Sequence, residues 1–145
     1  MSVLPCEKIY PSLDLEPLPK DFQQFGEARV LLIEDDRTTR AMVKSALEKH
    51  CCFVEAPNMS QGITLYNYML PDIVFLDIEL PDGDGNDLLH WMLRNDPGAY
   101  VVMFSGYSHT SNVIESMNTG AKGFVSKPFD IRRMLYFIDR CPRVH

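Results

Sequence analysis

The stretch Ile73-Val74-Phe75-Leu76-Asp77 decides the fold of this chain. Four consecutive apolar residues are typical of a strand that is buried on both faces of a parallel sheet. The run ends at a carboxylate, and the turn-forming residues 81–85 (Pro-Asp-Gly-Asp-Gly) follow it. Asp77 is therefore predicted to lie at the carboxyl end of a central strand, which is where open α/β sheets bind their ligands.

Further apolar runs alternate with helical patterns on both sides of this stretch. The predicted strands are 30–33, 52–56, 73–77, 100–104 and 123–126, and the predicted helices are 37–50, 59–70, 85–95, 110–118 and 130–140. Strands and helices in alternation predict a parallel sheet with right-handed crossovers and helices on both faces. We therefore predict an α/β protein with a five-stranded parallel sheet, a flavodoxin-like (βα)5 fold with strand order 2-1-3-4-5.

The first part of the chain differs from the rest. Prolines interrupt it repeatedly, acidic residues are scattered through it, and its apolar residues follow no period. We predict an extended N-terminal arm over residues 1–28, with a short turn of helix at 21–25, and one folded domain over residues 29–141.

Composition and charge favour a cytoplasmic protein. The formal net charge is −6 and no basic run is present, which argues against a nucleic-acid surface. No secretory signal begins the chain, and no apolar run approaches the ~18 residues of a membrane span. The cysteines (Cys6, Cys51, Cys52 and Cys141) show no CxxC spacing and are interpreted as reduced thiols.

Polar side chains follow several of the predicted strands. Residues 34–36 (Glu-Asp-Asp) follow the first strand, Asp77 ends the third, Ser105 follows the fourth and Lys127 follows the fifth. Because the carboxyl ends of parallel strands meet at one edge of a sheet, we expect these side chains to lie close together. Grouped carboxylates suit Mg²⁺, a lysine suits a phosphate oxygen, and an aspartate can attack phosphorus. The group therefore predicts a site that holds a phosphoryl group on Asp77.

These motifs resemble the receiver domain of the two-component response-regulator family, and in particular its single-domain, chemotaxis-regulator-like members. The resemblance extends over residues 29–140. The segments that carry it are Leu32-Ile33-Glu34-Asp35-Asp36, Phe75-Leu76-Asp77 with Pro81 and Gly85 after it, Phe104-Ser105-Gly106, and Lys127-Pro128-Phe129.

The resemblance implies a role for each site residue. Asp77 is the implied phosphoacceptor, with Ser105 and Lys127 beside it in the reaction. The implied Mg²⁺ ligands are Glu34, Asp35, Asp77 and the backbone carbonyl of Glu79. Ser105 and Phe124 are the implied switch pair, and the peptide bond before Pro128 is usually cis in the family.

The function implied is that of a signalling protein rather than an enzyme. A histidine kinase or a histidine phosphotransfer protein would donate the phosphoryl group to Asp77 in a Mg²⁺-dependent reaction. The surface formed by residues 110–118, 123–126 and 130–140 would then change, bind a downstream protein target, or pair two copies of the chain. No contact with nucleic acid or membrane is expected.

Two other interpretations remain open. The chain could be the receiver fragment of a longer DNA-binding or enzymatic response regulator. It could also be a Mg²⁺-dependent phosphatase with an aspartyl nucleophile. Such enzymes usually carry a second acid two residues after the first, a pattern that Asp77 and Glu79 imitate poorly.

Overall fold

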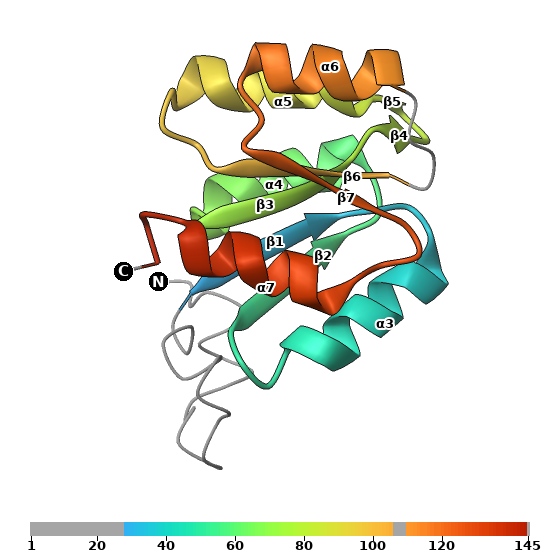
Figure 1. Ribbon diagram of the computed structural model, residues 1–145, viewed down its shortest axis with the longest axis vertical. Helices are drawn as coiled ribbons and strands as arrows, with labels where there is room; N and C mark the ends of the chain where they lie inside the picture. The colour runs from blue at the N-terminus through green and yellow to red at the C-terminus, as the bar shows by residue number, and fades with distance from the viewer. Residues whose placement is uncertain (1–27, 106–109, 145) are drawn as a thin grey trace.

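The computed structural model describes residues 28–105 and 110–144, and these contain the predicted parallel sheet (Figure 1). Its strands are β1 (Arg29–Ile33), β2 (Cys52–Ala56), β3 (Ile73–Asp77), β6 (Val101–Ser105) and β7 (Gly123–Ser126). They pair in the order β2-β1-β3-β6-β7, and every pairing is parallel. Counted along the chain this is the order 2-1-3-4-5, so the predicted fold class is confirmed.

Helices cover both faces of the sheet, as the alternating pattern predicts (Figure 1). They are α3 (Arg37–Leu47), α4 (Met59–Met69), α5 (Gly85–Asn95), α6 (Thr110–Thr119) and α7 (Ile131–Arg140). Apolar side chains of α3 and α7 share one core cluster with the sheet, and those of α4 and α5 share the other. Helix α6 lies beside α5, where the buried Ser116 Oγ donates to Asn86 Oδ1.

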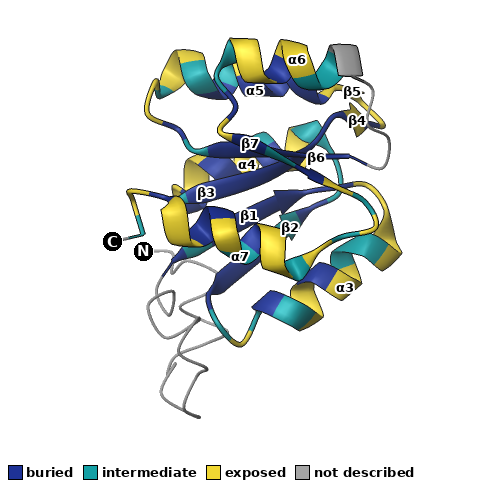
Figure 2. Cartoon of the chain, in the orientation of Figure 1, coloured by how far each residue is buried: buried dark blue, intermediate teal, exposed yellow. Residues whose placement is uncertain are grey.

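The central strand is buried over its whole length, as its uninterrupted apolar run requires (Figure 2). Every residue of β3 is buried, and so is every residue of the neighbouring β6. Asp77 is included, with 3% of its surface exposed. A carboxylate that is shielded to this extent needs a positive or hydrogen-bonding partner, because burial of an unpaired charge is costly.

Apart from element ends that shift by one residue, the structure differs from the prediction at two places. Helix α3 ends at Leu47 rather than at residue 50, because the N–H groups of His50 and Cys51 both donate to the Leu47 carbonyl and close a turn. The predicted loop after Asp77 contains a short antiparallel pair, β4 (Glu79–Leu80) and β5 (Gly83–Asp84).

Asp82 ties this hairpin to the start of α4. Its carboxylate oxygens accept hydrogen bonds from Met59 N at 2.8 Å and from Ser60 N at 3.1 Å. Since the first N–H groups of a helix have no partner within the helix, a carboxylate stabilises them. The loop that follows Asp77 is therefore fixed to a neighbouring helix.

Residues 1–27, which make up almost all of the predicted arm and include its predicted helical turn, lie outside the described residues. Ala28 is buried, and its carbonyl accepts from Cys52 N. Cys51 and Cys141 are free thiols, whereas Cys52 is disulfide-bonded, so the prediction of reduced thiols is wrong for Cys52. Within the described part of the chain, no helix combines the length and the apolar character that crossing a bilayer requires.

Candidate functional site

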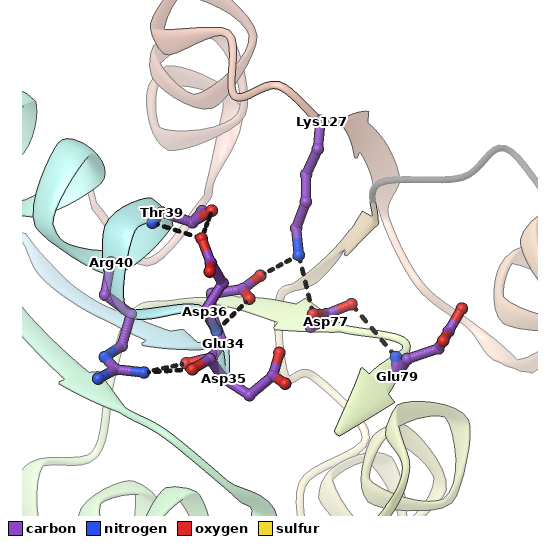
Figure 3. Close-up of polar contacts among 8 residues, drawn as sticks. All are labelled: Glu34, Asp35, Asp36, Thr39, Arg40, Asp77, Glu79 and Lys127. Atoms are coloured by element: carbon purple, nitrogen blue, oxygen red, sulfur yellow. Dashed lines mark hydrogen bonds and ion pairs between the residues drawn. The ribbon is translucent and has the colours of Figure 1, made fainter. Parts of the chain in front are cut away.

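The acidic residues meet at the carboxyl edge of the sheet because β1 and β3 are neighbours. Ile33, the last residue of β1, is in register with Leu76, one residue before the end of β3. Glu34, Asp35 and Asp77 therefore lie together, and one carboxylate oxygen from each lies within 4.8 Å of the others (Figure 3). The three carboxylates therefore lie close together in the structure, as the sequence predicts.

Lys127 enters the same site from the end of β7. Its Nζ lies 2.9 Å from Asp77 Oδ2 and is also ion-paired with Glu34 Oε1 (Figure 3). Its backbone N–H donates to the carbonyl of Ser105 at 2.7 Å, which fixes the lysine to the neighbouring strand. The peptide bond between Lys127 and Pro128 is cis, as the family resemblance implies.

The charges of this group do not balance. The carboxylates of Glu34, Asp35 and Asp77 lie together, and the ammonium group of Lys127 is paired with two of them, Glu34 and Asp77. Glu34 is fully buried and its pKa is raised to about 7, mainly because of burial and also because of the charge of Asp77. The bonds from Lys127 and from Asp36 N oppose that rise. Although burial lowers the pKa of Lys127, its bonds to Glu34 and Asp77 outweigh this and raise it.

Asp77 is held from two sides. Oδ2 faces Lys127, and Oδ1 accepts a hydrogen bond from Glu79 N at 3.2 Å. The carboxylate of Glu79 itself is directed away from Asp77 (Figure 3). Behind this turn, Gly85 N donates to the carbonyl of Ile78 at 2.6 Å. The Asp77 carboxylate therefore lies in a turn whose backbone is closed by a hydrogen bond from the first residue of α5.

Asp36 follows the acidic pair but has a different role. Its Oδ2 accepts from the N–H and the hydroxyl of Thr39, which makes Asp36 the N-cap of α3. The Asp36 carboxylate therefore stabilises the start of α3.

The two predicted switch residues lie outside the acidic cluster. Ser105 is buried at the end of β6, directly after Phe104, which is in register with Asp77. The chain that follows, residues 106–109, lies outside the described residues. Phe124 is half-buried on the edge strand β7 and packs against the apolar cluster shared with α4 and α5.

Sequence reasoning missed the contribution of Arg40. This residue of α3 donates to the backbone carbonyls of Glu34 and Asp35 (Figure 3). No motif singles out Arg40 among the 14 lysines and arginines in the chain. The one signal is its position about one turn after the start of the predicted helix 37–50, from which a long side chain can reach back to the preceding loop.

Comparison with known proteins agrees with this geometry. The sequence profile of the response regulator receiver domain matches residues 30–139. This chain belongs to the response-regulator receiver family. The receiver is 35% identical over 114 residues to the chemotaxis protein CheY of Bacillus subtilis, a match that covers 77% of this chain and 95% of that protein. It is 32% identical over 117 residues to CheY of Listeria monocytogenes, covering 79% of this chain and 98% of that protein.

A solved structure shows the same likeness. The CheY-like receiver domain from Methanospirillum hungatei superposes with a TM-score of 0.74 at 28% identity, covering 79% of this chain and 93% of that one. The receiver is accordingly a signalling protein of a two-component system, in a family whose members accept a phosphoryl group. Members of the family interact with histidine kinases or phosphotransfer proteins and with downstream targets.

Proposed function

We propose that this receiver accepts a phosphoryl group on Asp77 in a Mg²⁺-dependent reaction. One observation carries the proposal: the carboxylate of Asp77 lies beside two other carboxylates and 2.9 Å from the ammonium group of Lys127. An attacking carboxylate, a cation site and a fixed positive charge are the three elements that transfer of a phosphoryl group to an aspartate requires.

The residues present suit Mg²⁺. Glu34, Asp35 and Asp77 provide oxygen donors within 4.8 Å of one another, and Lys127 offsets only one of their three charges. Mg²⁺ prefers a small number of carboxylates and retains several waters. We assign these three residues as ligands, together with the backbone carbonyl of Glu79. When bound, Mg²⁺ neutralises negative charge on the transferring group.

The chain's own residues perform the remaining chemistry. An oxygen of Asp77 attacks the phosphorus of the donor, and a new O–P bond forms. The P–N bond to the donor histidine of the kinase or phosphotransfer protein breaks, and its electron pair stays on the imidazole nitrogen. The other ring nitrogen of that histidine carries a proton, so a neutral imidazole departs. Lys127 Nζ, which faces Asp77 Oδ2, binds a phosphoryl oxygen. Because the proposed donor is a histidine kinase or phosphotransfer protein, we also propose that the phosphoryl transfer takes place in the cytoplasm.

We also infer the consequence of the transfer. The phosphoryl group draws the hydroxyl of Ser105 toward Asp77, and Phe124 changes its position on β7. The surface of α6, β7 and α7 then favours its second conformation, in which it binds a downstream protein or a second phosphorylated copy. Phosphorylation acts by shifting the population of two existing conformations.

The test is labelling by acetyl phosphate, followed by intact-mass spectrometry. We expect a gain of one phosphoryl group per chain with Mg²⁺, and no gain when the metal is removed by a chelator. Multiple turnovers of a phosphate ester, without a stable gain in mass, would contradict the proposal and favour the phosphatase interpretation.

Mg²⁺ binding is expected to weaken as pH falls below about 7, because Glu34 then takes up a proton and loses its affinity for a cation. Between about pH 8 and about pH 6 we expect the Mg²⁺ dissociation constant to rise by roughly tenfold. Titration calorimetry at several pH values measures this dissociation constant.

The stability of the metal-free protein is expected to change with pH in the opposite direction. Because the pKa of Glu34 is raised in the folded state, the free energy of unfolding falls as pH rises through about 7. If neither the Mg²⁺ dissociation constant nor the free energy of unfolding changed with pH, the assignment of Glu34 as a buried metal ligand with a raised pKa would be contradicted.

A further inference from the structure

Arg40 extends from α3 over the loop that carries the acidic pair. One guanidinium nitrogen, Nη1, donates to the carbonyl oxygens of Glu34 and Asp35, both at 2.9 Å (Figure 3). Its Nε donates to Glu55 Oε1 on β2 at 3.1 Å. The side chain is 16% exposed, so the guanidinium group is largely shielded from water while it makes these bonds.

These contacts begin where the sheet stops. Strand β1 ends at Ile33, and the last sheet-like bond is the one from Glu34 N to the carbonyl of Ala56 at 3.0 Å. Beyond that point no strand among the described residues pairs with the carbonyl groups of Glu34 and Asp35, and the guanidinium group of Arg40 donates to them instead. Because Glu55 is itself part of β2, the guanidinium group ties the acidic loop to the sheet.

We propose that Arg40 is a positioning residue for the metal site. By holding two consecutive carbonyl groups, it sets the direction in which the side chains of Glu34 and Asp35 leave the backbone, so that a cation binds without rearranging the loop. Outer partners that orient metal ligands affect affinity although they never touch the metal. The inference rests on the proposed function, because it gives Arg40 a part in binding the Mg²⁺ that phosphorylation needs.

Charge and positioning predict opposite effects for the loss of Arg40. A guanidinium group near a cation site repels the cation, so its removal by itself would strengthen Mg²⁺ binding. Loss of a positioning contact weakens Mg²⁺ binding. A weaker affinity after substitution therefore cannot arise from the change in charge.

The experiment compares the Mg²⁺ dissociation constants of the unphosphorylated parent and Arg40→Ala by titration calorimetry. We expect a rise of about tenfold to a hundredfold in the variant. Its maximal rate of labelling at saturating Mg²⁺ stays close to that of the parent, because Asp77 and Lys127 are unchanged. A folded Arg40→Ala protein that binds Mg²⁺ as tightly as the parent, or more tightly, would overturn the inference.

Two further variants make the result unambiguous. Arg37→Ala removes the same charge from the same helix. Arg37 is exposed and its side chain makes no polar contact with the described residues, so the Mg²⁺ affinity of this variant should equal or exceed that of the parent.

If Arg40→Ala does not fold, Arg40→Lys takes its place, because lysine keeps the charge but loses the planar guanidinium fork. Weaker Mg²⁺ binding by Arg40→Lys supports the inference, and unchanged or tighter binding overturns it. A parent that binds no Mg²⁺ overturns the proposed metal site and the inference with it.

Discussion

The variant Asp77→Asn is expected to take up no phosphoryl group from acetyl phosphate under conditions that label the parent fully. Asparagine has almost the same size and shape as aspartate, so the surrounding turn is preserved. Its amide oxygen is a poor nucleophile and its amide group carries no charge. The variant therefore loses the attacking oxygen and one of the two carboxylates that pair with Lys127. Intact-mass spectrometry measures the loss directly.

Asp36→Asn is the matched control for this experiment. The change is chemically identical and lies one residue beyond the acidic pair, but Asp36 caps α3 and asparagine is an equally good N-cap. This variant should be labelled as the parent is. Labelling of Asp77→Asn at the level of the parent would show that another carboxylate is the acceptor.

Gly85→Ala is expected to destabilise the protein strongly. A Cβ at residue 85 would overlap the carbonyl oxygen of Asp77, and it would lie 2.9 Å from the Asp77 carbonyl carbon and from Ile78 Cα. These are backbone atoms, so no side chain can rotate away, and the turn that presents Asp77 must shift. Overpacking of this kind costs about 3 kcal/mol or more in free energy of unfolding. Urea denaturation measures this loss, and labelling should fall with it.

Gly98→Ala provides the comparison for Gly85. There the nearest atom to a new Cβ is the end of the flexible Arg143 side chain, and both residues are exposed. We expect a loss below about 1 kcal/mol, because exposed positions without special backbone needs tolerate substitution. Equal stability of Gly85→Ala and the parent would contradict the close approach of α5 to Asp77.

The sheet could be predicted from the sequence because its strands, except β2, are short apolar runs with a polar residue at or just after the end. That pattern defines β3 as Ile73–Asp77 and β7 as Gly123–Ser126 to the residue. The convergence of Glu34, Asp35, Asp77 and Lys127 followed from the parallel topology alone, since no local spacing brings residues so far apart together. The topology rule was sufficient because all of these groups lie at or just beyond strand ends.

The remaining features depend on contacts that leave no local pattern. The β4–β5 pair has two residues in each strand, too few for a periodic signal, and it depends on the bonds from Asp82 to the start of α4. Arg40 acts through backbone carbonyls, and every residue type has these. The end of α3 at Leu47 was missed because residues 48–50 are compatible with a helix, and backbone bonds to the Leu47 carbonyl end it.

The most direct test of the central claim is to locate the phosphoryl bond. After labelling with acetyl phosphate and Mg²⁺, sodium borohydride reduces an aspartyl phosphate to homoserine, and peptide mapping identifies the modified position. The account predicts homoserine at position 77 and at no other residue. Reduction at Asp35, Asp36 or Glu79 instead, or phosphate on Ser105, would contradict the assignment of Asp77 as the acceptor.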